Sequence, residues 1–234
     1  MCPLNSWDLS EVQTYPATIT KKVPGYEILH TLSAILISRS IRADASILVI
    51  GAGGGEELVR LAEALPRIRI TALDTSSIML KLAKSRCEDA GISNRVQFIR
   101  CDIHELPLTI RYDAAVCLLM LQFIAGTKEK QRFLLCVAAH LQPHSPFILA
   151  TICGDPISDS FQKQLLQWSD FAKRNEQPTH HTKHYIQSMG VTNHPIERES
   201  LIKLLHESNF HECTSYFKAL FVEAILCRKS DMKQ

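Results

Sequence analysis

The run of glycines in the first quarter of the chain is the feature that most constrains its fold. Gly51-Ala52-Gly53-Gly54-Gly55 directly follows the short apolar run 47–50 and precedes an amphipathic segment, residues 56–65. Glycine permits a sharp backbone turn and lets a ligand approach the amides at a helix N-terminus. The pattern predicts a strand, a tight turn and a helix. Two interpretations are open, a nucleotide-binding loop or a βα turn without a ligand.

Short apolar runs and helical patterns alternate along the rest of the chain. Further strands are expected at residues 69–73, 96–100, within 112–121, and at 147–152, and helices at 76–90, 128–141 and 197–208. Apolar strands that alternate with helices indicate a parallel sheet covered on both faces. Two β-rich runs, 213–219 and 221–228, are so closely joined that they must form an antiparallel hairpin at the sheet edge. The expected class is α/β, doubly wound and mostly parallel.

Two helical segments flank this alternation. Residues 26–41 carry apolar residues at helical spacing, which predicts an N-terminal helical cover over residues 1–45. Residues 159–189 are helical in pattern, polar and rich in histidine. The expected organisation is the cover followed by one compact unit, 46–234, with 155–194 as a helical insertion on the substrate side.

Composition narrows the class of protein. The 26 basic and 24 acidic residues give a net charge of +2, too weak a field to indicate nucleic-acid binding. The longest apolar runs are far shorter than a membrane helix needs, and the first residues lack the features of a signal peptide. Eight cysteines without CxxC spacing indicate small buried side chains in a reducing compartment, with no metal site. We expect a cytoplasmic protein without a membrane partner.

Two aspartates follow strands where a bound nucleotide would need acceptors. Asp74 closes the second strand 23 positions after Gly51, where a doubly wound sheet places a carboxylate that accepts hydrogen bonds from ribose hydroxyls. Asp102 follows the third strand, within reach of an exocyclic amine of adenine. Each could also cap a helix or a turn, a role compatible with ligand binding.

These motifs together resemble the class I S-adenosylmethionine-dependent methyltransferases. The resemblance runs in order through residues 47–55, Leu73-Asp74-Thr75-Ser76 with Met79-Leu80, Cys101-Asp102-Ile103 with Leu106-Pro107, Tyr112-Asp113-Ala114 and Leu141-Gln142-Pro143. It implies the Rossmann-like seven-stranded fold of that family, with an antiparallel last strand. It also implies S-adenosyl-L-methionine as the cofactor and a methyltransferase activity.

The resemblance assigns roles to individual positions. Gly51, Ala52 and Gly53 would contact the methionine part of the cofactor, Asp74 its ribose, Thr75 and Met79 the space beside ribose and adenine, Asp102 and Ile103 the adenine, and Leu118 and Leu119 the sulfonium region. Gly54 departs from the pattern, because family members often carry Ser or Thr there. A side-chain hydrogen bond is lost at that position.

A narrower resemblance is to the branch that contains carboxy-S-adenosylmethionine synthase, an enzyme of tRNA wobble-uridine modification. It rests on the stretches Val23-Pro24-Gly25-Tyr26, Leu121-Gln122-Phe123-Ile124 and Phe171-Ala172-Lys173-Arg174-Asn175. It implies that Tyr26 reaches the cofactor carboxylate; packing on the core is the other interpretation. Leu204, with Lys203 beside it, stands near the place where that branch has an arginine for the extra carboxylate.

The acceptor site is expected above the carboxyl ends of the strands, under the cover and residues 155–194. Three histidines in that segment, His180, His181 and His184, are weak candidates for a general base, because imidazole titrates near neutrality. A solvated helix face is the other interpretation. The fourth strand lacks the acceptor motif of nucleic-acid amino methyltransferases, so we expect a small-molecule acceptor.

Three further questions stay open at this level. A nicotinamide-dependent oxidoreductase shares the loop and the ribose acid, but Glu56 stands where the third glycine of GxGxxG would lie. A non-catalytic module that binds S-adenosylmethionine is a third interpretation. The sequence is compatible with a monomer or a homodimer.

Overall fold

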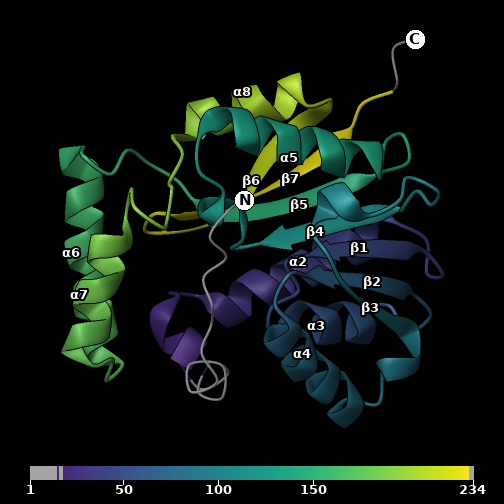
Figure 1. The fold of residues 1–234 in the computed structure, drawn as a ribbon, viewed down its shortest axis with the longest axis horizontal. Coiled ribbons are helices and arrows are strands. Elements are labelled where there is room, and N and C mark those ends of the chain that lie inside the picture. Colours follow the sequence, from purple (N-terminus) through teal and green to yellow (C-terminus); the bar gives the residue numbers. More distant parts are fainter. Residues whose placement is uncertain (1–14, 16–17, 232–234) are drawn as a thin grey trace.

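Seven strands form one sheet in the order β3-β2-β1-β4-β5-β7-β6. The computed structural model describes Tyr15 and residues 18–231 (Figure 1). The strands are β1 (Ser46–Ile50), β2 (Arg69–Asp74), β3 (Val96–Arg100), β4 (Ala114–Leu118), β5 (Pro146–Ile152), β6 (Phe210–Ala219) and β7 (Val222–Lys229). The first five are parallel, whereas β7 runs antiparallel to β5 and β6. The predicted doubly wound sheet with an antiparallel last strand and an edge hairpin is therefore confirmed.

Helices cover both faces of this sheet (Figure 1). One layer consists of α2 (Tyr26–Ser40), α3 (Glu56–Ala64) and α4 (Ser77–Asp89), and the other of α5 (Thr127–Ala139) and α8 (Arg198–Glu207). The expected helices occupy these positions with ends shifted by one or two residues, as is usual for helix boundaries. The predictions for residues 1–14 and 16–17, which belong to the predicted cover and include Cys2, lie outside the described residues.

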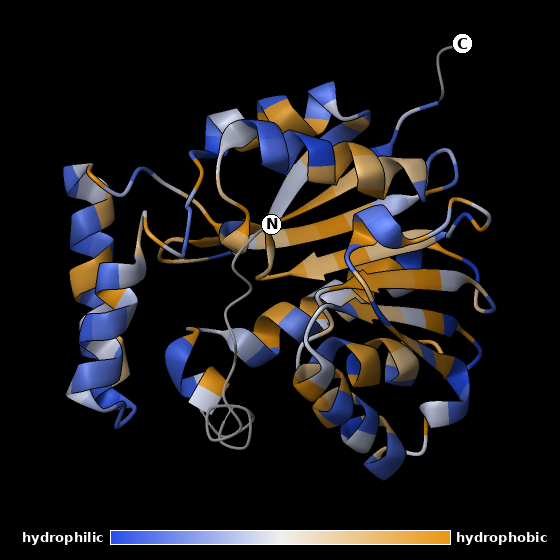
Figure 2. Ribbon diagram, viewed as in Figure 1, coloured by the Kyte–Doolittle hydropathy of each residue, from blue (hydrophilic) through white to orange (hydrophobic). Residues whose placement is uncertain are grey.

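The alternation of side chains along the strands divides the core into two parts. In β1, Ile47 and Val49 pack with α2 and α3, whereas Leu48 and Ile50 pack with α5 on the opposite face. Successive side chains of a strand point to opposite faces, so a strand between two helical layers must be apolar at every position. Figure 2 shows this as hydrophobic strands between helices of mixed character.

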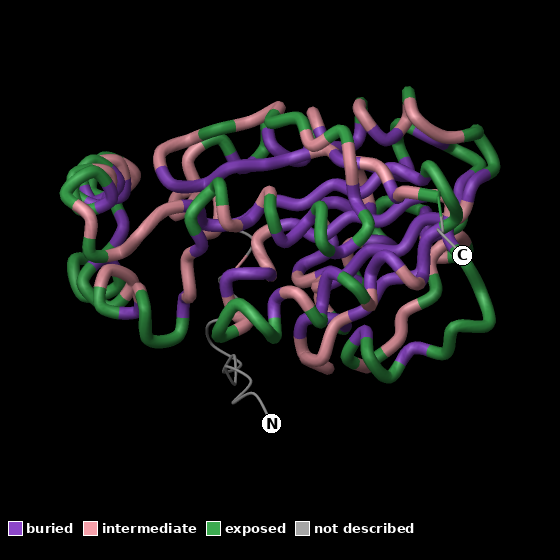
Figure 3. The backbone as a smooth tube through the Cα atoms, turned by 90° about the horizontal axis from the view of Figure 1, so that it is seen from above, coloured by how far each residue is buried: buried purple, intermediate pink, exposed green. Residues whose placement is uncertain are grey.

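The helices α6 (Asp159–Arg174) and α7 (Thr179–Ser188) lie beside the sheet instead of on either face (Figures 1 and 3). A small apolar cluster attaches them: Phe161 and Trp168 of α6 pack against Phe221 in the β6–β7 turn. The indole Nε1 of Trp168 also donates a hydrogen bond to the carbonyl of Lys22, 2.7 Å away. The division into cover, main unit and insertion stays a prediction.

The apolar run 112–121 illustrates where the sequence pattern misplaces a strand end. β4 ends at Leu118, and the chain turns at Leu119, whose φ of 56° is unusual for a residue with a side chain. Leu121–Phe123 then form a 3-10 turn. The pattern could not show this end because Leu119 and Leu121 are as apolar as the strand itself.

Two properties of the described chain bear on the compositional expectations. The cysteines from Cys87 to Cys227 are free, and four of these seven are buried. Burial raises the pKa of the Cys117 thiol above its ordinary value. Over the described residues, no helix has the length and apolar character that crossing a bilayer requires.

Candidate functional site

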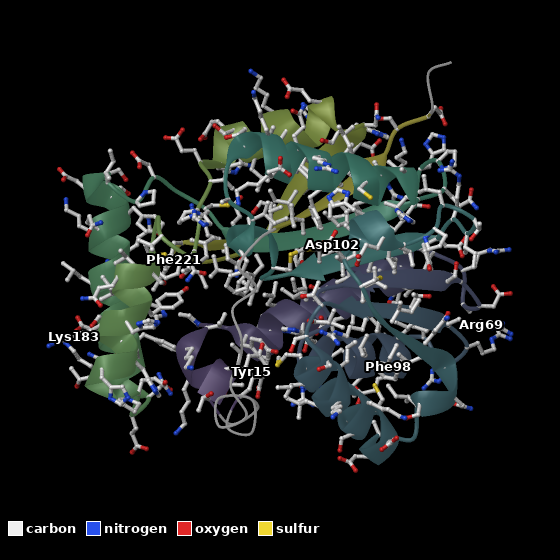
Figure 4. All side chains as sticks on the ribbon, in the orientation of Figure 1. Tyr15, Arg69, Phe98, Asp102, Lys183 and Phe221 are labelled. Atoms are coloured by element: carbon white, nitrogen blue, oxygen red, sulfur yellow. The ribbon has the colours of Figure 1, made fainter. Side chains whose placement is uncertain are left out.

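A cavity of about 690 Å³ opens at the carboxyl ends of β1, β2 and β4. Every residue that the sequence nominates for the cofactor lines it: Tyr26, Gly51, Ala52, Gly53, Asp74, Thr75, Met79, Asp102, Ile103, Leu118 and Leu119. Figure 4 labels two residues that line it, Asp102 in the turn after β3 and Tyr15 in the segment before α2. The tertiary structure thus brings together residues spread over more than 90 positions of sequence.

The glycine loop forms one end of the cavity. Gly51 has a φ of +72°, and a Cβ built there would lie only 2.7 Å from the Cγ of Met120. Gly55 has a φ of +79°, and its Cβ would lie 2.9 Å from the Cα of Ala83 in α4. Both positions therefore require glycine for two reasons, backbone conformation and close approach of a neighbouring element.

Asp74 holds this loop in place. Its Oδ2 accepts a hydrogen bond from the amide of Gly53 at 2.9 Å, and its Oδ1 accepts one from the amide of Ser76 at 2.8 Å. Burial raises the pKa of the Asp74 carboxyl above its ordinary value, although the two amide donors oppose this shift. Of the two alternatives for Asp74, the structure supports the turn, because Oδ1 bonds the amide two residues on. The helix cap is wrong, because the hydroxyl of Ser76 accepts the amide of Met79 at that position.

Asp102 does take the capping role that the sequence left open. Its Oδ1 accepts the amide of His104 at 2.9 Å, and Glu105 in return accepts the amide of Asp102 at 2.8 Å. This reciprocal capping box fixes the turn after β3. The side chain is exposed, and Asp102 lines the cavity.

Tyr15, which no sequence pattern indicated, also lines the glycine-loop end of the cavity. The ring of Tyr15 approaches Gly54, whose Cβ would lie 3.1 Å from the Tyr15 ring. A larger residue than glycine would thus displace this ring. Where the resemblance implies Ser or Thr, this chain has a contact between a glycine and an aromatic ring.

A buried polar group completes that end. The ring of Tyr26 packs 4.2 Å from the ring of His30, and the Nε2 of His30 lies 3.6 Å from a carboxylate oxygen of Glu57. All three side chains are buried and line the cavity. Burial raises the pKa of the Tyr26 phenol, so Tyr26 is a hydrogen-bonding phenol and not a phenolate.

The turn after β4 forms the opposite wall. Gln122 is buried; its side-chain amide donates to the carbonyl of Leu119 at 2.6 Å and its side-chain oxygen accepts the hydroxyl of Thr151 at 3.2 Å. These bonds hold the left-handed backbone of Leu119. A non-glycine residue in this conformation stores strain, which is characteristic of binding sites.

The three nominated histidines lie elsewhere. His180, His181 and His184 are exposed on α7, and none lines the cavity. Their role as bases stays a prediction without support from their position. His194, in the loop after α7, lines the cavity instead. Lys203 is exposed and Leu204 is packed in the core beside α5, so neither reaches the cavity.

The residues that sequence reasoning missed left signals of different strength. His30 follows Tyr26 by four positions, so the two share one helix face. Glu57 stands in the first turn of the helix that the glycine loop opens. His194 lies in the insertion, but nothing in its local sequence separates it from the other histidines. Tyr15 carries no local signal, because only the fold brings it to Gly54.

Comparison with known proteins agrees with the resemblance to methyltransferases over the central part of the chain. Residues 47–144 match the family model described as a methyltransferase domain. A ubiquinone biosynthesis O-methyltransferase of Rickettsia felis is 26% identical over 136 residues, which cover 54% of this chain and 53% of the relative. A carboxy-S-adenosyl-L-methionine synthase of Campylobacter hominis is 27% identical over 144 residues, 62% of this chain and 60% of the relative. The chain thus spans about half to three fifths of the length of these curated relatives.

Solved structures share the fold at low sequence identity. A putative O-methyltransferase of Nostoc punctiforme superposes with a TM-score of 0.66 at 15% identity, over 93% of this chain and 60% of that one. The CurJ carbon methyltransferase superposes with a TM-score of 0.68 at 14% identity, over 94% and 58%. The domain match, the strand order and these folds agree. Residues 47–144 match the methyltransferase domain model, and the chain has the Rossmann-like fold of class I S-adenosylmethionine-dependent methyltransferases.

Proposed function

We propose that this chain is an S-adenosylmethionine-dependent methyltransferase that acts on a small-molecule acceptor. The observation that supports this most is the bond from the amide of Gly53 to the Oδ2 of Asp74, 2.9 Å long, in the wall of a cavity that Asp102 also lines. It joins the glycine loop, which we propose to bind the cofactor, to the carboxylate that we propose as the ribose acceptor. A glycine turn that binds no ligand does not require a cavity beside Gly53 and Asp74.

The polar groups of the cavity fit the nucleoside part of this cofactor. Each oxygen of Asp74 accepts one amide and keeps a second lone pair, which a ribose hydroxyl can use. Asp102, in the turn after the neighbouring strand β3, can accept a hydrogen bond from the exocyclic amine of adenine. Ile103 and Met79 are buried apolar residues of the same wall, suited to the faces of the ring.

The glycine-loop end fits the amino-acid part. The carboxylate of Glu57 is buried beside the loop, where it can accept from an α-ammonium group, and the phenol of Tyr26 can donate to an α-carboxylate. Leu118 and Leu119 provide an apolar wall between this end and the acceptor space. The bound cofactor supplies an electrophilic methyl group, and these side chains align it and exclude water.

Calorimetry with three ligands tests the proposal. We expect S-adenosylmethionine and S-adenosylhomocysteine to bind and the dinucleotide NAD to bind at least 100-fold more weakly, because the loop lacks the GxGxxG spacing. Preferential binding of NAD would overturn the proposal in favour of an oxidoreductase. Binding of S-adenosylmethionine without turnover on a broad acceptor panel would support a non-catalytic binding module instead.

Carboxy-S-adenosylmethionine synthase is the second candidate, favoured by the position of Tyr26 in the cavity and by the Campylobacter hominis relative. Against it stands Leu204, which is buried in the core away from the cavity. The mass of the nucleoside that copurifies with the protein separates the two. A carboxylated derivative would support the synthase, and S-adenosylmethionine or S-adenosylhomocysteine would support the methyltransferase.

A further inference from the structure

Among the described residues, two histidines line the cavity, His30 of α2 and His194. Backbone hydrogen bonds fix the position of His194. Its amide donates to the carbonyl of Gln122 at 2.7 Å. Two residues later, the amide of Ile196 donates to the carbonyl of Ile152, and the amide of Gly154 donates to the carbonyl of Ile196. The loop that carries His194 is therefore bonded both to the turn after β4 and to the end of β5.

The side chain of His194 has no recorded hydrogen-bond partner among the residues that the structure describes, although His30 and His140 each use a ring nitrogen on a carbonyl. Both of its ring nitrogens are thus available to a ligand. Around it the cavity wall is mostly apolar, formed by Phe123, Ile124 and Val191. Thr192 adds one hydroxyl to this part of the wall. A few polar groups in an apolar wall select a ligand that has polar atoms at the matching places.

Burial and the ammonium of Lys130 in α5 both act on the charge of this imidazole. Lys130 is buried, and its Nζ donates to the carbonyl of Leu121 at 2.7 Å, in the same turn that binds the His194 amide. Partial burial and the nearby ammonium lower the pKa of His194 below its ordinary value. The residues 121–123 and 191–193 that pack beside it carry no titratable side chain, so Lys130 is the charged group that faces it from the described elements.

We infer that His194 is the catalytic base for an apolar acceptor with a phenol-like hydroxyl, held between His194 and the wall of Phe123, Ile124 and Val191. This inference rests on the proposed methyltransferase function. In the reaction, the acceptor oxygen forms a bond to the methyl carbon and the carbon–sulfur bond breaks with its electron pair on sulfur. The hydroxyl proton goes to the imidazole of His194.

The acidity of the acceptor follows from the neutral state of the base. A weakly basic imidazole takes a proton efficiently from a hydroxyl of moderate acidity, whereas an alkyl alcohol holds its proton too strongly. An apolar acceptor also matches a wall that offers few other polar partners. The structure thus assigns the reacting group and the class of molecule that carries it.

Methylation of 4-nitrophenol, phenol and benzyl alcohol by the full chain tests this inference. We expect methylation of the two phenols and not of benzyl alcohol. His194→Ala should lower kcat on phenol by about 100-fold or more, with the affinity for S-adenosylmethionine within twofold of wild type. The loss should be smaller on the more acidic 4-nitrophenol, and added imidazole should restore part of the rate on phenol.

Matched variants separate the outcomes. His206→Ala, an exposed histidine of α8, should leave the rate and its pH profile unchanged. The acidic limb of the pH profile should disappear in His194→Ala and not in His206→Ala. If S-adenosylmethionine binds but neither phenol is methylated, or if His194→Ala keeps the wild-type rate and profile, the inference is overturned while the proposed function stands. Failure of S-adenosylmethionine to bind would instead overturn the proposed function.

Discussion

The amide of Gly53 donates a hydrogen bond to the Oδ2 of Asp74 at 2.9 Å, so the end of β2 holds the loop that follows β1. The other oxygen of Asp74 accepts the amide of Ser76 at 2.8 Å and thereby fixes the start of α4. One carboxylate thus positions both elements that enclose the glycine-loop end of the cavity. Because both bonds are made within the protein, this carboxylate fixes the conformation of the loop.

Asp74→Ala removes both amide partners and the ribose acceptor. We expect the affinity for S-adenosylmethionine to fall by about 10- to 100-fold, the equivalent of a lost hydrogen bond to a charged group. Calorimetry measures the dissociation constant, and circular dichroism checks that the fold is retained. Asp44→Ala, an exposed residue before β1, serves as the control and should bind as wild type does. Equal affinities of the two variants would contradict the role of Asp74.

Gly51→Ala combines a left-handed backbone with a steric clash. We expect the free energy of unfolding to fall by about 2–4 kcal/mol, partly from the φ of +72° and partly from the 2.7 Å approach of the new Cβ to Met120. Gly91→Ala is the matched control, with a φ of +67° but nothing within 4 Å of its Cβ, and should lose only about 1 kcal/mol. Urea denaturation measures both. Equal losses would show that the contact with Met120 contributes nothing.

The lowered pKa of the buried Lys130 predicts that the free energy of unfolding depends on pH. Burial lowers its pKa to about 8 from an ordinary value of 10.5, so between these values the unfolded chain binds more protons than the folded chain. The contribution of Lys130 to the free energy of unfolding should therefore rise from pH 8 to pH 10.5, by up to about 3 kcal/mol. Below pH 8 the folded protein carries the full penalty of a buried ammonium.

The difference in unfolding free energy between wild type and Lys130→Met isolates this effect from other groups that titrate at high pH. We expect the difference to shift in favour of wild type as the pH rises from 7 to 10. Lys203→Met, an exposed lysine on α8, is the control and should give a difference that does not change with pH. A flat profile for Lys130→Met would contradict a lowered pKa.

Arg198 neutralises a buried acid in the sheet. Its Nε lies 2.9 Å from Oε1 of Glu223, whose side chain is 2% exposed, and the second carboxylate oxygen has no partner in the described structure. Arg198→Ala should lower the free energy of unfolding by about 1–3 kcal/mol, because it leaves a buried carboxylate unpaired. The double change Arg198→Ala with Glu223→Gln should recover part of that loss.

Arg132→Ala is the matched control for the Arg198 variant, because Arg132 pairs with Glu129 on the surface, where both side chains are more than half exposed. We expect a change below about 0.5 kcal/mol there. Urea denaturation measures the free energy of unfolding of wild type, the two single variants and the double variant. A loss at Arg132 as large as that at Arg198 would mean that burial of Glu223 does not matter.

Local sequence patterns predicted the elements well and the ends of some elements poorly. The apolar strands and the helices between them follow from side-chain alternation and helical spacing, which depend on neighbouring residues alone. The end of β4 at Leu118 does not, because the turn at Leu119 is stabilised by Gln122 and Thr151. Likewise β6 begins at Phe210, earlier than expected, because pairing with Lys229 extends it.

The residues nominated from sequence for cofactor contact all line one cavity, because motifs at strand ends meet wherever parallel strands share an edge. The acceptor side followed no such rule. The histidines of α7 and His194 look alike in sequence, and backbone hydrogen bonds between distant segments, such as that from His194 to Gln122, place His194 in the cavity wall.

The sequence by itself determined the sheet, its helical layers and the glycine loop, since each depends on local patterning and on the conformational freedom of glycine. The tertiary structure alone decided that Asp74 holds the loop, that Tyr15 covers Gly54 and that His194 lines the cavity. The physical reason is distance along the chain. Contacts between residues far apart in sequence are fixed by packing and by buried hydrogen bonds, and no local pattern encodes them.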